Sequence, residues 1–221
     1  MEALITGSSS GIGLATAQLF LERGWNVTGV DIAPAAITDT SYRHYVADVA
    51  SKEALSALGL CPDVVVTCAG VQNSGRDIEV NLLGTINTVE AFAFHKGIRS
   101  VLMVASSSAH TGAEFIEYAA AKGGVLTYMR GAAQRLAQLG ATCNSISPGG
   151  VTTEMNRPVM DDPKLWQQIM DQTPLHHWAE PREIAEWIWF LTVVNHSCTG
   201  QDILIDAGEK DLNFNFVWPA G

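Results

Sequence analysis

The feature that most constrains this chain is a regular alternation of short apolar segments with longer helical patterns. Residues 63–70 (DVVVTCAG) and 100–108 (SVLMVASSS) contain continuous apolar runs, which are typical of strands buried on both faces of a parallel sheet. Between such runs, apolar residues recur at the spacing of an amphipathic helix. The alternation therefore predicts an α/β fold, a doubly wound parallel sheet between two layers of helices.

The expected elements follow from these runs. We expect strands at 2–6, 26–32, 42–49, 63–70, 100–108, 142–150 and 201–208. We expect helices at 14–24, 54–60, 80–97, 118–140 and 181–191. In the last helix, Ile184, Trp187, Ile188 and Leu191 stand at positions i, i+3, i+4 and i+7, which predicts that they share its buried face.

The length of 221 residues suits one domain, and we expect a single domain over 1–221 because neither repeats nor a low-complexity linker interrupts the pattern. Apolar residues make up 47% of the chain, enough for a large core. Residues 153–181 and a tail at 209–221 fall outside the strand–helix alternation.

Charge and cysteine content exclude several classes of function. The net charge is −10, with acidic residues spread along the chain, whereas a nucleic-acid partner needs a basic stripe. The sequence shows neither a signal segment nor an apolar run of membrane-spanning length, which predicts a cytoplasmic protein without a membrane partner. No metal is expected, because the four cysteines lack ligand spacing; they are interpreted as reduced core residues: Cys61, Cys68, Cys143 and Cys198.

The turn between the first strand and the first helix carries Gly7, Gly11 and Gly13. Glycine permits positive φ angles and lets a ligand approach the backbone closely. The N-terminus of the following helix offers unpaired N–H groups and a partial positive charge, which suit a pyrophosphate. The spacing G-x-x-x-G-x-G differs from the commoner G-x-G-x-x-G, and a purely structural turn is the alternative. The position directly after the first strand favours phosphate binding.

Asp31 ends the second predicted strand, 18 residues after Gly13, close to the roughly 20 expected for a ribose-binding acid. A carboxylate there can accept hydrogen bonds from both hydroxyls of an adenosine ribose and would repel a 2′-phosphate. This favours NAD over NADP as the cofactor. The alternative is an acid that only caps a loop.

Tyr118 and Lys122 stand four residues apart in a predicted helix, so their side chains share one face. A tyrosine has a pKa near 10 and needs a shift of roughly three units, or about 4 kcal/mol, to exchange protons near neutrality. An ammonium at about 4–5 Å supplies stabilisation of that order. Lys122 could therefore make Tyr118 a usable acid or base. An ordinary surface pair at helical spacing is the alternative.

Six short motifs occur in a characteristic order. They are TGSSSGIG at 6–13, DV at 48–49, CAG at 68–70, NLLG at 81–84, YAAAK at 118–122 and SPGGVTTEM at 147–155. Each is weak alone, but in this order they resemble the short-chain dehydrogenase/reductase family, from about Leu4 to Gly208. The resemblance implies a Rossmann sheet of about seven strands, a homodimer or homotetramer, and a small-molecule substrate.

The resemblance also implies roles for the matching residues. Tyr118 would be the catalytic acid/base, Lys122 would bind the nicotinamide ribose and lower the Tyr118 pKa, and Asn81 would position a water behind Lys122. Asp48 and Val49 would contact adenine. Cofactor contacts are implied for Tyr118, Lys122, Gly7, Ser10, Gly11, Ile12, Gly13, Asp31, Ile32, Asp48, Val49, Ala69, Gly70, Pro148, Gly149, Val151 and Thr153.

A serine after the fifth predicted strand would hold the substrate oxygen. Alignment with the family strand indicates Ser106, with a one-residue deletion before Tyr118. Ser107 is the alternative, and Ser108 is interpreted as a turn residue.

The chain departs from the family pattern at two places. Cys68 replaces an asparagine that braces the central sheet, a change expected to affect stability more than chemistry. Only eleven positions separate Gly70 from Asn81, where the family usually has a longer loop. This shortening is expected to remove part of one wall near the cofactor, and it leaves substrate size and oligomer geometry open.

Residues 153–181 correspond to the family's substrate lid. Methionine and tryptophan there suit an apolar or ring-shaped substrate, or else they pack the lid on the body. The residues in question are Met155, Met160, Trp166, Met170, His176, His177 and Trp178. His110 either faces the pocket or is a satisfied loop histidine.

Residues 104–111 (VASSSAHT) are similar to their counterpart in 2,3-dihydro-2,3-dihydroxybenzoate dehydrogenase, which suggests a cyclic diol or a hydroxy acid as substrate. The tail carries Phe214, Phe216 and Trp218. An exposed aromatic tail is unfavourable, so we expect it to pack on a neighbouring subunit.

Together these interpretations predict an NAD(H)-dependent oxidoreductase that transfers hydride between nicotinamide and a secondary alcohol or ketone. One alternative is a Rossmann protein that senses NAD(H) without turnover. Another is an epimerase or dehydratase on the same fold. The joint presence of Asn81, Ser106, Tyr118 and Lys122 favours the enzyme.

Overall fold

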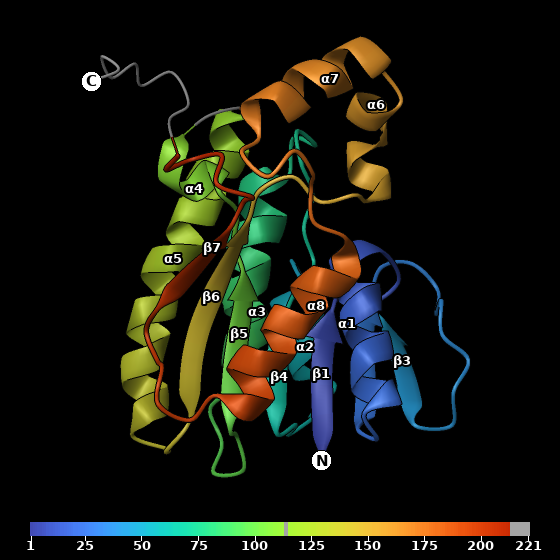
Figure 1. Ribbon diagram of the computed structural model, residues 1–221. Coiled ribbons are helices and arrows are strands. Elements are labelled where there is room, and N and C mark those ends of the chain that lie inside the picture. The colour runs from blue at the N-terminus through green and yellow to red at the C-terminus, as the bar shows by residue number, and fades with distance from the viewer. Residues whose placement is uncertain (113–114, 213–221) are drawn as a thin grey trace.

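A parallel sheet runs through the computed structural model, which describes residues 1–112 and 115–212 (Figure 1). Its seven strands in the described residues confirm the predicted fold class, in the order β3-β2-β1-β4-β5-β6-β7. The strands are β1 (Glu2–Thr6), β2 (Asn26–Asp31), β3 (Tyr42–Val46), β4 (Val64–Thr67), β5 (Ser100–Val104), β6 (Thr142–Pro148) and β7 (Asp202–Ile205).

Helices or helical turns connect the successive strands, except that a loop without a helix joins β2 to β3. The α-helices are α1 (Gly11–Glu22), α2 (Lys52–Ser56), α3 (Gly84–Phe92), α4 (Ser108–Thr111), α5 (Ile116–Ala137), α6 (Arg157–Met160), α7 (Pro163–Gln172) and α8 (Pro181–Trp189). Two π-helical turns, η1 (Ile78–Leu83) and η3 (Phe190–Val194), and one 3₁₀ turn, η2 (Glu154–Asn156), complete the described part of the chain.

Two hydrophobic clusters attach the helices to opposite faces of the sheet. On one face, α1 and α8 bury Phe20, Ile184 and Ile188 against β1, β4 and β5. On the other face, α2, α3 and α5 bury residues such as Phe92 and Met129. The two layers explain why β4 and β5 read as continuous apolar runs, because every residue of these two strands is buried.

The carboxyl ends of β1, β2 and β4 lie level with one another. Thr6 at the end of β1 is in register with Val30 of β2 and with Thr67 of β4. The α6–α7 segment lies beyond the carboxyl ends of the strands (Figure 1). Any groove at this edge of the sheet therefore opens beneath the segment interpreted as a lid.

Several local predictions were wrong. The strands predicted at 63–70 and 100–108 end at Thr67 and Val104, and the helix predicted at 80–97 ends at Phe92. The second helix begins at Lys52 rather than at residue 54, because the Ser51 hydroxyl accepts a hydrogen bond from the Ala54 N–H and caps it. Trp187 is 43% exposed, whereas Ile184, Ile188 and Leu191 are buried. The buried stripe of α8 includes Ala185, so Trp187 falls outside it.

The four cysteines are unpaired, but they are not all core residues. Cys143 is buried and Cys68 and Cys198 are partly buried, whereas Cys61 is exposed, which corrects the prediction for Cys61. The aromatic residues of the tail, Phe214, Phe216 and Trp218, lie outside the described residues. No helix in the described ranges is long and apolar enough to cross a membrane.

We predict that Phe20→Ala lowers the free energy of unfolding by about 3–5 kcal/mol. Phe20 is fully buried, and its ring centroid lies 5.3 Å from that of Trp25 and 4.9 Å from that of Trp189. Trp187→Ala on the neighbouring helix is the control and should cost less than about 1 kcal/mol, because that side chain is half exposed. Urea unfolding measures both, and equal losses would contradict this account of the core.

Candidate functional site

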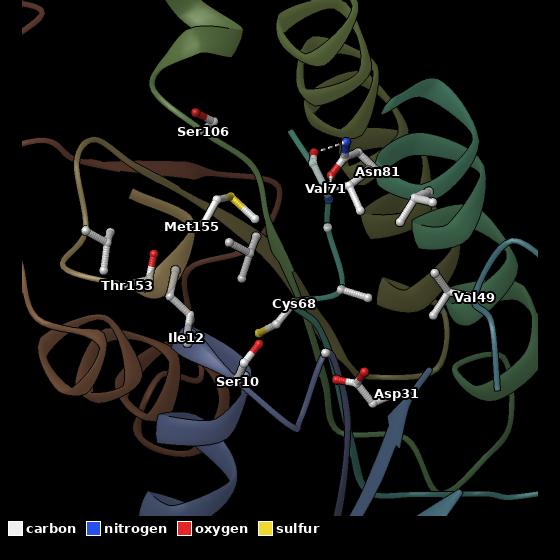
Figure 2. A pocket seen from close by; sticks show the side chains of 18 of the residues that line it. Ser10, Ile12, Asp31, Val49, Cys68, Val71, Asn81, Ser106, Thr153 and Met155 are labelled. Atoms are coloured by element: carbon white, nitrogen blue, oxygen red, sulfur yellow. Dashed lines mark hydrogen bonds between the residues drawn. The ribbon is translucent and has the colours of Figure 1, made fainter. Parts of the chain in front are cut away.

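A cavity of about 450 Å³ opens along the carboxyl ends of the strands. It lies where the strand order reverses, since β1 has β2 on one side and β4 on the other. Ligands of open α/β sheets bind at such a reversal. Figure 2 shows side chains from several elements turned towards this space, from Asp31 at the end of β2 to Ser106 after β5.

The cavity brings together every residue that the sequence singled out as catalytic or cofactor-binding. These residues come from segments far apart in the chain: the β1–α1 turn, the ends of β2, β4 and β5, helix α5, and the segment after β6. The cavity also includes residues that sequence analysis did not select, among them Val71, Arg76 and Asn156.

The glycine turn after β1 forms the floor of the cavity. Gly7 has φ +68°, and a Cβ there would lie 2.8 Å from the Ala69 backbone nitrogen. A Cβ on Gly13 would overlap the Gly7 carbonyl. Larger residues would therefore push the turn away from β4 and close the approach to the backbone.

The N-terminus of α1 faces the same space. The side chain of Ser10, which precedes α1, makes no capping hydrogen bond, and the first turn carries no acidic residue. No side chain of the N-cap or of the first turn therefore neutralises the partial positive charge of this helix end. A phosphate group fits this position by both shape and charge.

Asp31 is fixed at the end of β2. Its Oδ2 accepts a hydrogen bond from the Ser9 N–H at 3.0 Å, and its Oδ1 accepts one from the Ala33 N–H at 2.9 Å. The carboxylate thus caps the loop and also lines the cavity. The two interpretations of Asp31 are compatible, because each carboxylate oxygen keeps a further lone pair.

Asp48, after β3, is held in the same way. Its Oδ1 accepts from the Ala50 N–H at 2.9 Å, and its Oδ2 accepts from Arg76 Nη2 at 2.9 Å. Burial raises the pKa of Asp48, but these two hydrogen bonds outweigh it and leave the pKa below its ordinary value. A charged acceptor therefore lines this part of the cavity.

Asn81 lies in the π-helical turn η1 and is fully buried. Its Nδ2 donates to the carbonyl oxygens of Val71 and Asp77, and its Oδ1 accepts from the Val71 N–H. The side chain thus ties η1 to the segment after β4, and the bond to Val71 is drawn in Figure 2. π-helical turns occur frequently at functional sites, and this one could not be predicted from the residue pattern.

Of the three serines after β5, only Ser106 lines the cavity. Its hydroxyl donates to Ser108 Oγ at 3.3 Å and accepts from the Ser108 N–H at 3.2 Å. Ser107 directly precedes α4, and its backbone N–H donates a hydrogen bond to the Pro148 carbonyl. The structure therefore brings Ser106, rather than Ser107, to the same space as Tyr118 and Lys122.

Lys122 is 5% exposed, and its ammonium donates a hydrogen bond to the Val104 carbonyl at 2.8 Å. Its Nζ lies 5.6 Å from the centroid of the Tyr118 ring. Burial lowers the pKa of Lys122 to about 8, and Cys68 partly opposes the shift. The pair is therefore a half-buried phenol beside a buried ammonium, not a solvated pair on the surface.

Cys68 is the residue that stands where the family usually has an asparagine. It lines the cavity near Ser10 and Ile12, as Figure 2 shows, and burial raises the pKa of its thiol to about 12. The thiol is neutral at neutral pH. Cys68 therefore supplies a small uncharged side chain to the cavity wall.

In the predicted lid, only Met155 of the seven singled-out residues lines the cavity. Trp166 and Trp178 pack edge to face, with ring centroids 5.0 Å apart. The Trp178 ring also occupies the space that a Cβ on Gly150 would need, and its Nε1 donates to Glu209 at 3.0 Å. These tryptophans hold the lid on the body, so the packing interpretation applies to them.

The histidines are likewise accounted for by structural contacts. His176 and His177 bond through Nδ1 to the carbonyl oxygens of Met170 and Leu175. His110 bonds to Asp202 at 2.8 Å and is absent from the cavity lining, which favours the satisfied loop histidine. Within residues 1–112 and 115–212, no group of three or more His, Cys, Asp or Glu side chains could hold a metal ion.

Comparison with known proteins connects this geometry to a family. A family model described as "Enoyl-(Acyl carrier protein) reductase" matches residues 7–210. Acetoacetyl-CoA reductase from Paracoccus denitrificans is 33% identical, with 86% of this chain and 89% of that protein covered. 2,3-Dihydro-2,3-dihydroxybenzoate dehydrogenase from Escherichia coli strain K12 is 30% identical over 92% of this chain and 94% of that protein.

Among solved structures, the ligand-free aldohexose dehydrogenase of Thermoplasma acidophilum has a TM-score of 0.87. It is 23% identical and covers 99% of this chain and 97% of that one, a likeness that concerns the fold. The family match spans the glycine turn, the Tyr118–Lys122 pair and the segment after β6. The chain belongs to the short-chain dehydrogenase/reductase family of oxidoreductases, whose members use nicotinamide cofactors.

Proposed function

We propose that this protein is an NAD(H)-dependent oxidoreductase that interconverts a secondary alcohol and a ketone. The observation that carries the proposal is a shared cavity: Ser106, Tyr118 and Lys122 line the same space as Asp31 and the uncapped N-terminus of α1. One extended dinucleotide could contact both groups of residues, with its phosphates at α1 and its nicotinamide beside Tyr118.

The catalytic roles follow from what each side chain can do. Ser106 holds the substrate oxygen through its hydroxyl, and Tyr118 gives a proton to that oxygen or takes one from it. A bound nicotinamide would supply or accept the hydride. The chain itself contributes orientation of the substrate and stabilisation of the charge that develops on its oxygen.

Lys122 supports Tyr118 electrostatically. A charged ammonium behind the phenol favours its ionised form and so lowers the barrier to proton exchange. The same ammonium binds the hydroxyls of the nicotinamide ribose, and Asn81 positions a water behind it. Because the Lys122 pKa is about 8, the side chain is mostly protonated at neutral pH.

Charge at the far end of the cavity supports NAD over NADP. Asp31 lies there, and its carboxylate would repel a 2′-phosphate. Arg76 is the nearby cation, but Glu79 and Asp48 already hold it. A 2′-phosphate would therefore meet excess negative charge.

The substrate class rests on the cavity wall and on the relatives. Met155 presents a flexible apolar side chain beside the catalytic residues. The matched relatives are named for a cyclic dihydrodiol acid and for an acyl-CoA ester. A cyclic diol or a hydroxy acid is the substrate we propose to test first, with a panel of alcohols, ketones and cyclic diols followed by NADH absorbance.

Tyr118→Phe should lower kcat/KM by at least about 10²-fold, because it removes the proton donor. NADH should still bind with little change, since the ring remains. Tyr128→Phe is a matched control on the same helix: its hydroxyl bonds to Glu90, away from the cavity, so activity should persist. Full activity of Tyr118→Phe would remove the proposed role, and loss of activity in both variants would point to damage to α5.

NADH should bind at least about fivefold more tightly than NADPH, since one repulsive charge pair costs on the order of 1 kcal/mol. Asp31→Asn should lower the ratio of the NADPH to the NADH dissociation constant, because asparagine removes the charge and keeps the shape of the side chain. Asp39→Asn, in the exposed loop before β3, should leave the ratio unchanged. Fluorescence titration measures the affinities of all three proteins for both dinucleotides, and tighter binding of NADPH to the wild type would show that Asp31 is misassigned.

The buried Lys122 should make the stability of the cofactor-free protein depend on pH. Its pKa is about 8 in the folded protein and 10.5 in the unfolded one, so between these values the unfolded chain binds more protons. The contribution of Lys122 to stability should therefore rise by about 2 kcal/mol between pH 7.5 and 9.5. Urea unfolding of the wild type and of Lys122→Met measures the difference.

The exposed-lysine variant Lys52→Met should follow the wild type across this pH range. If the difference in unfolding free energy between the wild type and Lys122→Met did not change with pH, the result would contradict a buried ammonium at Lys122.

A further inference from the structure

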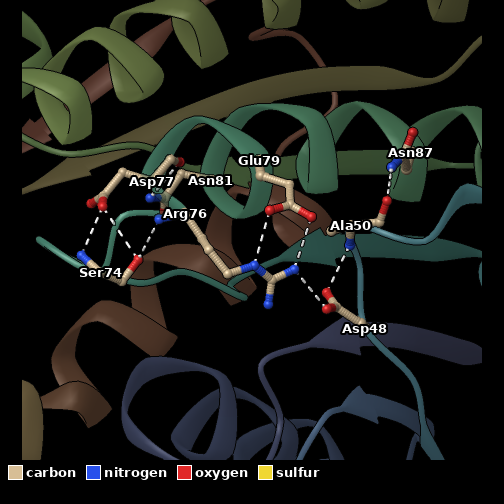
Figure 3. Close-up of polar contacts among 8 residues, drawn as sticks. All are labelled: Asp48, Ala50, Ser74, Arg76, Asp77, Glu79, Asn81 and Asn87. Atoms are coloured by element: carbon tan, nitrogen blue, oxygen red, sulfur yellow. Dashed lines mark hydrogen bonds and ion pairs between the residues drawn. The ribbon is translucent and has the colours of Figure 1, made fainter.

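Arg76 forms a bridge between two carboxylates from different parts of the chain. Its Nη2 donates to Asp48 Oδ2 at 2.9 Å, and Asp48 follows β3. Its Nε and Nη2 donate to the two carboxylate oxygens of Glu79, each at 2.9 Å, in a two-pronged contact with η1 (Figure 3). The guanidinium plane is thus fixed by three hydrogen bonds.

This bridge spans one end of the cavity. Arg76 and Asp48 both line it, together with Asp31 and Val49, whereas Tyr118 and Lys122 belong to α5 and line it with Ser106. A dinucleotide that places its phosphates at α1 and one base beside Tyr118 must place its other base near Asp31, Asp48 and Arg76. That end offers the apolar Val49, a charged acceptor and a planar cation.

The bridge contributes little to the stability of the fold. The side chains of Arg76, Glu79 and Asp48 are 45%, 50% and 35% exposed, and ion pairs with this exposure are typically worth less than about 1 kcal/mol. Arg76 lies in the short connection between Gly70 and Asn81. The bridge therefore closes the side of the cavity where a longer connection would otherwise stand.

We propose that Arg76 is a specificity-determining positioning residue for the adenine base. Arg76 fixes the Asp48 carboxylate so that one of its free lone pairs accepts a hydrogen bond from the exocyclic amino group of the base. Arg76 itself limits the space available to the flat ring on the side of η1. A base that carries a carbonyl oxygen in place of the amino group would meet a charged acceptor and would be rejected.

This inference rests on the proposed binding of a nicotinamide dinucleotide. The probe is reduced nicotinamide hypoxanthine dinucleotide, which differs from NADH only in the oxo group that replaces the adenine amino group. Fluorescence titration gives the dissociation constants of both dinucleotides for each variant, without turnover. The measured quantity is the ratio of the two constants.

The wild type should favour NADH by about tenfold or more, as expected for one hydrogen bond to a charged group. In Arg76→Met the ratio should fall to about threefold or less, mainly through weaker binding of NADH. Arg43→Met, on β3 and outside the cavity lining, is the control and should keep the wild-type ratio. If the role of Arg76 were merely structural, its substitution would weaken the binding of both dinucleotides alike and leave the ratio of the two dissociation constants unchanged.

Should Arg76→Met fail to fold, Arg76→Lys gives the same measurement, since lysine keeps the charge but cannot bond to both carboxylates in this geometry. A wild-type ratio near one, or a ratio that survives substitution of Arg76, would overturn this inference alone. A wild type that binds neither dinucleotide would instead overturn the proposed function, and this inference with it.

Discussion

The position of β1 between β2 and β4 is the constraint on which the site depends. Because the chain moves outward from β1 to β2 and β3, and then returns to β4 on the other side, the connecting helices cover opposite faces of the sheet. The strand order therefore reverses between the ends of β1 and β4. The cavity, the glycine turn and the uncapped end of α1 all lie at this edge.

Burying the charged Lys122 side chain costs free energy of folding. The folded chain buries this ammonium, which donates a hydrogen bond to the Val104 carbonyl and lies near Cys68. Burial of a charge lowers stability, and it also strengthens the field that the charge exerts on Tyr118. The same low-polarity surroundings thus explain both the depressed pKa of the lysine and its usefulness beside a phenol.

Much of the fold could be predicted from the sequence because its signals are local. The buried strands, the glycine turn and the Tyr118–Lys122 spacing each depend on residues close together in the chain. The ordered motifs further place residues of the β1–α1 turn, α5 and the segment after β6 at one site, and the structure brings all of them to one cavity.

The remaining features depend on contacts between distant residues, for which one sequence carries no periodic signal. The Arg76 bridge joins positions 28 residues apart. The Trp178 ring occupies the space beside Gly150 that the Cβ of any other residue would fill. Trp187 was assigned to the wrong face of α8 because the buried stripe is set by packing against α1, through Ala185, and not by spacing alone. Cys61 is exposed for a similar reason: the apolar character of a cysteine does not determine whether a residue in a loop is buried.

The central claim is that one dinucleotide spans the cavity, from the acidic end at Asp31 to the phenol and ammonium on α5. A crystal structure of the protein with NADH tests it most directly. The account predicts the pyrophosphate at the N-terminus of α1, the nicotinamide beside Tyr118, and Lys122 Nζ within hydrogen-bond distance of the adjoining ribose. A nicotinamide bound elsewhere, or a Tyr118 hydroxyl turned away from the reactive carbon with Lys122 out of reach of the ribose, would contradict it.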